Sequence, residues 1–200
     1  MITRQELISE SELKFKKSAG CMIGLAVGDA LGDLGRMQEY RQRYGIVTNL
    51  YDEAKSTDDT EFGLLTAKNL IDNKGSISRE TVLEAWKTYI LAQGGVLDRG
   101  GRPLYGAAAN IARGIMPPFS GRDNVMNNDD GAAMRIAPIG IVCAGDVEKA
   151  AEMAAIEAEI SHDKDGIWAA QAVAASIAIA MVGGTTKEII DAGNQFGPED

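Results

Sequence analysis

The stretch from Leu13 to Gly35, which reads LKFKKSAGCMIGLAVGDALGDLG, decides the fold class of this chain. Gly20, Gly24 and Gly28 lie four apart on one stripe, where the lack of side chains permits close contact with another helix. The stretch therefore predicts a long helix that ends near residues 32–35 and uses its glycine stripe for packing. Its apolar residues recur three or four positions apart, as on one helix face: Phe15, Ala19, Met22, Ile23, Ala26, Val27, Ala30 and Leu31.

Similar spacing predicts further helices along the chain. Ser78 and Asp146 are expected N-caps, and Pro103 suits the first turn of a helix. The polar segment 120–131 predicts a long loop, and the strand-like segment 46–51 is too short and isolated for a sheet. The chain is therefore predicted to be all-α. The expected helices cover residues 61–73, 79–93, 103–114, 132–144, 147–160 and 166–182, and a last one runs from a capping box at 185–188 to about 193.

The composition limits the class of protein and its partners. The chain has 200 residues, 45% hydrophobic and 24% charged, which suits one globular domain with its own core. Its net charge of −9 repels nucleic acid and anionic membrane surfaces, so we expect neither as a partner. Cys21 and Cys143 are the only cysteines, which argues against a disulfide framework. The N-terminus shows no secretory signal and the apolar run 166–184 fits a buried helix, so we predict a cytoplasmic protein.

The most informative acidic residues are expected at helix junctions. Residues 56–61, STDDTE, begin a helix, where Ser, Thr and Asp are favoured caps. The same hydroxyls and carboxylates are hard oxygen ligands of the kind that Mg²⁺, Mn²⁺ and Ca²⁺ prefer. A second acidic turn at residues 28–33, GDALGD, favours a cation site, because two such turns together can hold a cation that neither holds alone. Asp98, which precedes a pair of glycines, is a candidate third contributor.

The polar loop joins an apolar helix at residues 127–135, NNDDGAAMR. A helix start of this kind offers free backbone N–H groups to a phosphate or a ribose hydroxyl. Arg135 either bonds a pyrophosphate or forms an ion pair, and the pattern leaves both roles open. Asp129 and Asp130 are expected to be caps.

His162 is the only histidine, and it follows Ser161 between two expected helices. It is either structural or, beside Asp163, a residue that bonds a ligand hydroxyl. A nucleophilic triad is not supported, because the chain has no Gly-x-Ser-x-Gly elbow and its one histidine lies in a loop of different character.

Taken in order, four motifs resemble the ADP-ribosylglycohydrolase family: residues 28–32 (GDALG), 56–60 (STDDT), 131–140 (GAAMRIAPIG) and 161–162 (SH). The similarity spans nearly the whole chain. It implies a compact, multi-helix orthogonal bundle with two Mg²⁺ ions, or Mn²⁺ in their place, in a central cleft. In such a site the metals hold the distal ribose by its hydroxyls and activate a water that attacks the anomeric carbon.

The resemblance also assigns roles to residues of this chain. Carried over by motif, Thr57, Asp58 and Asp59 are metal ligands, and Asp58 or Asp59 also steers the attacking water. Asp98 is a further candidate metal ligand only because it precedes Gly100 and Gly101. The remaining motifs place the ADP-ribose contacts at Gly131, Ala132, Met134, Arg135, Ser161 and His162.

One departure from the family concerns the metal site. The family carries an Asp-x-Asp-Ser/Thr motif near its C-terminus that completes the site, and no such motif follows Gly131 here. Residues 163–165 have the spacing but are followed by Gly166. We therefore expect residues 1–200 to form one domain that lacks the family's C-terminal third.

The implied function is Mg²⁺-dependent hydrolysis of the glycosidic bond between ADP-ribose and a modified side chain, with ADP-ribosylarginine as the expected linkage. The expected partner is an ADP-ribosylated protein or a small ADP-ribosyl conjugate. One alternative is a hydrolase of another N-ribosyl compound that uses the same chemistry. The other is a catalytically silent relative, crystallin-like or ADP-ribose-binding, which the missing C-terminal ligands favour and the acidic turn at 57–59 opposes.

Overall fold

The computed structural model describes residues 2–96 and 100–197, and within these ranges it contains helices and loops but no strand. The all-α prediction is confirmed. None of the described helices is long and apolar enough to span a membrane. In chain order the helices are α1 (Arg4–Ser9), α2 (Ser11–Arg36), α3 (Gln38–Tyr44), α4 (Asp58–Asp72), α5 (Arg79–Tyr89), η1 (Leu91–Gln93), α6 (Arg102–Ala112), α7 (Phe119–Arg122), η2 (Ala133–Arg135), α8 (Ala137–Val142), α9 (Val147–Ala158), α10 (Asp165–Met181), α11 (Thr186–Gly193) and η3 (Asn194–Phe196).

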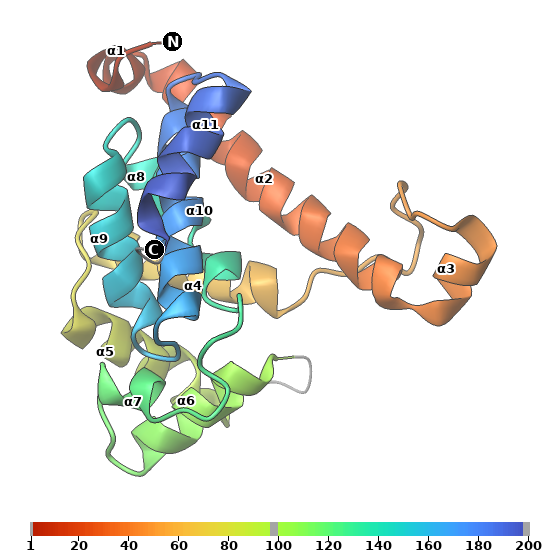
Figure 1. Cartoon of the computed structure of the whole chain (residues 1–200), viewed down its shortest axis with the longest axis vertical. Helices are drawn as coiled ribbons and strands as arrows, with labels where there is room; N and C mark the ends of the chain where they lie inside the picture. The colour runs from red at the N-terminus through yellow and green to blue at the C-terminus, as the bar shows by residue number, and fades with distance from the viewer. Residues whose placement is uncertain (1, 97–99, 198–200) are drawn as a thin grey trace.

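Helix α10 organises the body of the molecule and packs against α8, α9 and α11 (Figure 1). Small side chains on α10 let the neighbouring helices approach closely. Gly140 of α8 is required at one such approach, because a Cβ there would lie 2.5 Å from Ile177 Cγ2. The buried residues of this core include Ala170, Ala174 and Ala178 of α10 with Ile136, Ile139, Cys143, Ala150, Ala154 and Ala158.

A second, aromatic core lies between α4, α5 and α6. The rings of Phe62 and Trp86 are tilted against each other with centroids 5.3 Å apart. Fully burying an aromatic or large aliphatic side chain contributes about 1.5–3 kcal/mol. This core anchors α4 in the body and so positions the first turn of that helix. Its buried members are Phe62, Val82, Trp86, Leu104, Ala107, Ile111 and Ile160.

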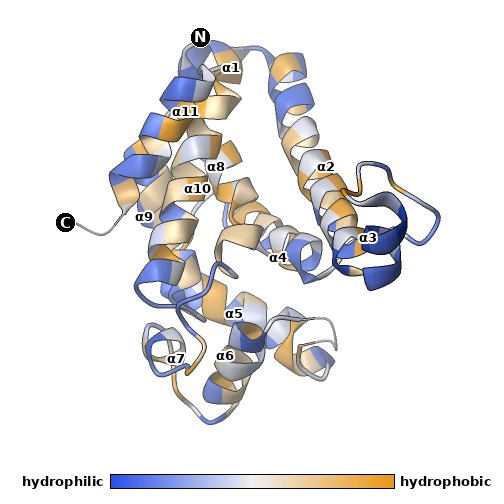
Figure 2. Ribbon diagram, turned by 45° about the vertical axis from the view of Figure 1, so that its right-hand side comes forward, coloured by the Kyte–Doolittle hydropathy of each residue, from blue (hydrophilic) through white to orange (hydrophobic). Residues whose placement is uncertain are grey.

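Helices α2 and α3 extend away from the body (Figures 1 and 2). The packing expected for the glycine stripe is wrong for the described residues, because a Cβ at Gly20, Gly24 or Gly28 would meet nothing within 4 Å. Apolar side chains beside the stripe are open as well, with Phe15 72% and Ile23 63% exposed. Instead, α2 packs through its other face, against α4 and α8.

Most helix bounds follow the predictions, but only some of the predicted caps are confirmed, because η2 begins after Ala132 with no side-chain cap and the caps expected at Asp129 and Asp130 are wrong. Ser78 and Asp146 cap α5 and α9, and the box at 185–188 opens α11. The helix expected over 132–144 is instead divided into η2 and α8, with Pro138 in the first turn of α8. The expected loop 120–131 overlaps the end of α7, and the segment 46–51 forms no strand.

Candidate functional site

Asp29 joins the C-terminal part of α2 to the first turn of α4. Its carboxylate accepts hydrogen bonds from the N–H and the hydroxyl of Thr57, both at 2.6 Å. It also accepts from the N–H and the hydroxyl of Thr60, at 3.2 and 2.7 Å. Thr57 is the N-cap residue of α4, but its own side chain makes no cap bond. Asp29 therefore caps this helix from another helix, and Asp58 and Asp59 are not used for capping.

Three carboxylates gather at this junction. Asp58 is 8% exposed and accepts the N–H of Gly101 at 3.0 Å, which connects the start of α6 to the site. Partial burial, with the charges of Asp29 and Asp58, raises the pKa of Asp59 to about 6, although Arg36 opposes the shift. Burial also raises the pKa of Asp29, but the four hydrogen bonds outweigh it and hold that pKa below its ordinary value. Among the residues that the structure describes, none forms an ion pair with these carboxylates, and the charge of Arg36 offsets their negative charge only in part.

The donors at the junction fit a hard cation in kind. Mg²⁺ binds oxygen, usually through one or two carboxylates with several waters, and Asp58, Asp59 and the Thr57 hydroxyl are such donors. Within residues 2–96 and 100–197, however, no three His, Cys, Asp or Glu side chains converge closely enough to hold a metal ion alone. Asp98, the further predicted ligand, lies outside the described residues. The described side chains alone could thus supply only part of a coordination shell.

The motif at residues 131–135 approaches the same junction. Helix α4 packs against η2, which follows this loop, and the charge of Asp130 contributes weakly to the raised pKa of Asp59. Gly131 is half-buried, and its N–H donates to Asp129 Oδ1 at 2.9 Å. Ala132 is fully buried, and Met134 packs against the aromatic core. Of these predicted ADP-ribose contacts, Gly131 alone lies at the edge of the site.

Arg135 points into the protein. Its side chain is fully buried, and Nε lies 2.9 and 2.8 Å from the two carboxylate oxygens of Glu157. Its Nη2 donates to Ser161 Oγ at 2.7 Å, and its guanidinium carbon lies 5.6 Å from the centroid of the Trp86 ring. Burial raises the pKa of Glu157, and the charge of Arg135 opposes that shift. Of the two roles left open by the sequence, the structure shows the ion pair, and this placement gives a pyrophosphate contact no support.

His162 is also buried, at 1% exposure. Its Nδ1 lies 2.7 Å from Ser161 Oγ, and its Nε2 lies 2.9 Å from Asp129 Oδ1. Burial and the charge of Arg135 lower the pKa of His162 to about 4, although Asp129 opposes the shift. The carboxylate partner is thus Asp129, which is distant in sequence, and not the neighbouring Asp163.

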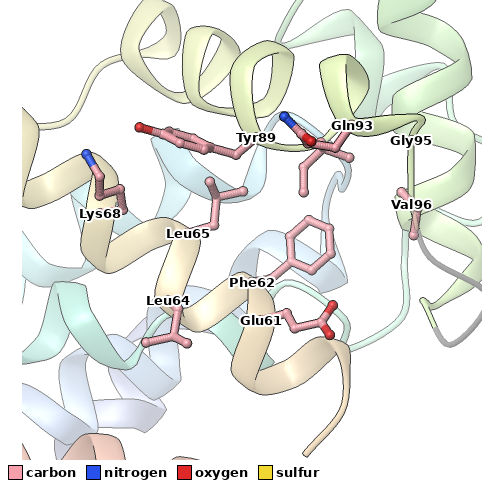
Figure 3. Close-up of a pocket in the computed structure, with 10 residues that line it drawn as sticks. Glu61, Phe62, Leu64, Leu65, Lys68, Tyr89, Gln93, Gly95 and Val96 are labelled. Carbon is pink, nitrogen blue, oxygen red and sulfur yellow. The ribbon is translucent and has the colours of Figure 1, made fainter.

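An apolar pocket of about 340 Å³ follows the acidic turn along α4 (Figure 3). Phe62 and Leu65 come from α4, and Tyr89 from α5 lies across from them. Glu61, three residues after Asp58, places its carboxylate at the rim. The lining of the pocket therefore begins on α4 three residues after Asp58 and is mainly apolar.

Sequence analysis did not predict the contacts that two residues, Asp29 and Asp129, make in the structure. Asp29 belongs to the quoted GDALG motif, so a signal existed, but only the fold shows that it holds Thr57. Asp129 was expected to be a simple cap, and no local pattern connects it to His162, which lies 33 positions later.

Comparisons with known proteins show the family to which the sequence is similar. A family model described as ADP-ribosylglycohydrolase matches residues 10–200. A protein of Archaeoglobus fulgidus, itself uncharacterized, is 30% identical to the chain over 187 residues. That alignment covers 88% of this chain and 59% of the relative, so the chain spans less than two thirds of the relative's length.

Proposed function

The chain belongs to the ADP-ribosylglycohydrolase family, and we propose that it catalyses hydrolysis of the glycosidic bond between ADP-ribose and a modified side chain. The expected linkage is ADP-ribosylarginine. The observation that carries the proposal is the junction of Asp29, Asp58 and Asp59. Asp29 and Asp58 are buried and accept hydrogen bonds from hydroxyl or N–H groups, Asp59 is partly buried, and none of the described residues forms an ion pair with these three carboxylates. Such an arrangement costs stability unless a positively charged ligand binds there.

We propose Mg²⁺ as that cation, with Thr57, Asp58 and Asp59 as the residues that hold it. When bound, Mg²⁺ lowers the pKa of a water and orients ribose hydroxyls. The chain's own contribution is to fix these donors. Asp29 holds Thr57 and Thr60, and the Gly101 N–H holds Asp58.

Asp59 is the better candidate to accept a proton from the attacking water. Its carboxylate is partly exposed, and no described residue donates a hydrogen bond to it, so its oxygens remain open to a water. Asp58, in contrast, is held by Gly101 and is better placed as a fixed ligand. The partner in this proposal is an ADP-ribosylated protein or a small ADP-ribosyl conjugate.

A binding protein without turnover is the second candidate. It is favoured by the absence of a three-carboxylate metal cluster among the described residues. Hydrolysis of another N-ribosyl compound would use the same junction but would not require recognition of a pyrophosphate.

The test is release of ADP-ribose from an ADP-ribosylarginine peptide by the 200-residue chain, with Mg²⁺ and then with EDTA. We expect release with Mg²⁺ only, and loss of at least about 100-fold in D58N or D59N, since each removes a charged ligand. D72N, at the exposed end of the same helix, is the matched control. Release that persists in EDTA would contradict the metal role.

A chain that shows no release is then titrated with free ADP-ribose by calorimetry and assayed on simple N-ribosides. Tight ADP-ribose binding without product would favour the binding protein over the hydrolase. Turnover of simple ribosides would favour the other hydrolase. A chain that neither binds nor releases ADP-ribose would overturn the proposed function.

A further inference from the structure

The segment 120–129 is fastened along its length to residues 160–163. Four hydrogen bonds of polar side chains and backbone groups connect these two segments, which are distant in sequence. A loop with few attachments would be free to move, whereas this one is held up to the edge of the carboxylate junction. The bonds measure 2.8 to 2.9 Å and join Ser120 to Ile160, Asn124 to Ser161, Asn127 to Asp163, and Asp129 to His162.

The network behind His162 determines which ring nitrogen carries the proton. Arg135 Nη2 can only donate, so Ser161 Oγ accepts from it. The single hydroxyl proton of Ser161 is then directed to His162 Nδ1, which accepts. The pKa of His162 lies at about 4, so the ring is neutral at physiological pH and its proton is on Nε2. Nε2 therefore donates to Asp129 Oδ1, and the bonds run in one direction from the buried guanidinium to an exposed carboxylate.

Glycines form the slot in which this histidine sits. A Cβ at Gly166 would lie 2.6 Å from His162 Cδ2, and a Cβ at Gly131 would lie 3.2 Å from Nε2. A Cβ at Gly121 would lie 2.6 Å from the His162 carbonyl oxygen. The backbone at Gly131 and Gly166 thus approaches the ring closely, and the backbone at Gly121 approaches the main chain of His162.

We propose that His162 is a positioning residue of the carboxylate junction, which acts through Asp129 to hold residues 129–131 against the first turn of α4. Asp129 Oδ1 accepts from His162 and from the Gly131 N–H, so one oxygen joins the buried network to the loop backbone. Asp130, the residue between them, adds its charge to that around Asp59. The inference rests on the proposed function only for its effect on ligand binding, because the hydrogen bond exists without it.

The first measurement is the ¹⁵N spectrum of the chain labelled in histidine. His162 is the only histidine, so one pair of ring signals reports its protonation. We expect a protonated Nε2 and an unprotonated Nδ1 from pH 5.5 to 8. A ring protonated on Nδ1 would overturn the proposal.

Two matched variants separate the two ring nitrogens. In H162Q the side-chain nitrogen falls near the position of Nε2 and keeps a donor for Asp129. In H162N the side-chain oxygen falls near the position of Nδ1 and keeps an acceptor for Ser161, but the donor for Asp129 is lost. We expect the Gly131 amide to exchange its hydrogen at least about tenfold faster in H162N than in H162Q. Equal exchange in the two variants would contradict a role through Asp129.

Because His162 is buried, Asp129 provides a second test at an exposed position. D129N keeps an acceptor oxygen and D129A removes it, so only D129A is expected to speed exchange of the Gly131 amide. Unchanged exchange in D129A would overturn the proposal even if neither His162 variant folds.

The consequence for the site is tested by calorimetric titration with Mg²⁺ alone. We expect H162N to bind Mg²⁺ several-fold more weakly than H162Q, because Asp130 is no longer held near Asp59. Equal affinities would overturn the effect on the junction. A wild-type chain that binds no Mg²⁺ would contradict the proposed function, whereas the ring signals and the Gly131 exchange judge the positioning role independently.

Discussion

The body around α10 and the junction of α2 with α4 both bury carboxylates, but among the described residues only the carboxylate in the body has a cation as its ion-pair partner. Glu157 is 3% exposed and lies against the guanidinium of Arg135. Asp29 and Asp58 are nearly as buried, at 8% each, and receive only hydroxyl and N–H donors. A buried charge that is paired contributes to the fold, whereas buried carboxylates with no ion-pair partner among the described residues are the basis of the cation site that we propose.

The largest expected effect comes from removing the cation in the body. R135M leaves Glu157 buried and unpaired, which should cost about 3–5 kcal/mol in the free energy of unfolding. Urea denaturation measures the loss. R79M, which breaks the exposed pair with Glu159, is the matched control and should cost less than about 1 kcal/mol.

A second substitution sharpens this result. In the double variant R135M/E157L both charges are replaced by apolar groups, so most of the loss should be recovered. Equal losses in R135M and R79M would show that the body gains nothing from pairing its charge, and the comparison would fail.

The next effect is expected at the junction, from D29A. The change leaves the Thr57 and Thr60 donors without their acceptor, and we expect a cost of about 2–3 kcal/mol. D146A is the control, because that carboxylate caps α9 through one N–H bond and otherwise forms a largely exposed ion pair with Arg4, and it should cost about 1 kcal/mol. A cost for D29A no larger than that of D146A would contradict the cross-helix cap.

The pH dependence of the D29A effect has a definite sign. The pKa of Asp29 is lower in the folded chain than its ordinary value, so its contribution is fully present above that ordinary value. It is lost as the pH falls towards the lowered folded pKa. The difference between wild type and D29A should therefore shrink in acid, and a difference that grows in acid would contradict the hydrogen-bonded carboxylate.

A smaller effect of opposite sign is expected from D59N without metal. The folded pKa of Asp59, about 6, lies above its ordinary value, so its ionisation costs stability that grows between about pH 4 and pH 6 and stays constant above. Because Asp59 is partly exposed, we expect D59N to stabilise the metal-free chain by only about 1 kcal/mol at pH 7.5, and not at pH 4.

Thermal unfolding with and without Mg²⁺ completes the D59N test. Mg²⁺ should stabilise the wild type and the D72N control, but have little effect on D59N. If, in the absence of metal, D59N is less stable than the wild type, repulsion between the carboxylates of the junction does not destabilise the chain.

The parts of the fold that could be predicted from sequence are those in which a helix buries a continuous face. Helices α4, α5 and α10 show the helical repeat because their inner residues meet the two cores. Helix α3 was not predicted because it buries no residue, and α1 buries only Leu7. A helix without a buried face leaves no hydrophobic pattern to detect.

The candidate site likewise has one part that could be predicted from the sequence and one part that could not. Thr57, Asp58 and Asp59 are adjacent in sequence, so their chemistry was visible as a motif. The pairing of Arg135 with Glu157 joins residues 22 positions apart, and Glu157 lies within an otherwise ordinary helical pattern. Tertiary contacts of this kind decide whether a charged residue faces a ligand or a partner in the core, and local spacing does not carry that information.

The smallest expected effect tests whether packing separates the two regions as charge does. Gly24 on α2 has open space where a Cβ would stand, so G24A should stabilise the 200-residue chain by about 0.5–1 kcal/mol, the ordinary gain for alanine over glycine inside a helix. G140A is the matched control, because its Cβ would collide with Ile177 and should destabilise the chain. Urea denaturation of both variants measures the difference. If G24A destabilises this chain as G140A does, the outer face of α2 is packed in solution, and the contrast between a closely packed body and an open α2 is wrong.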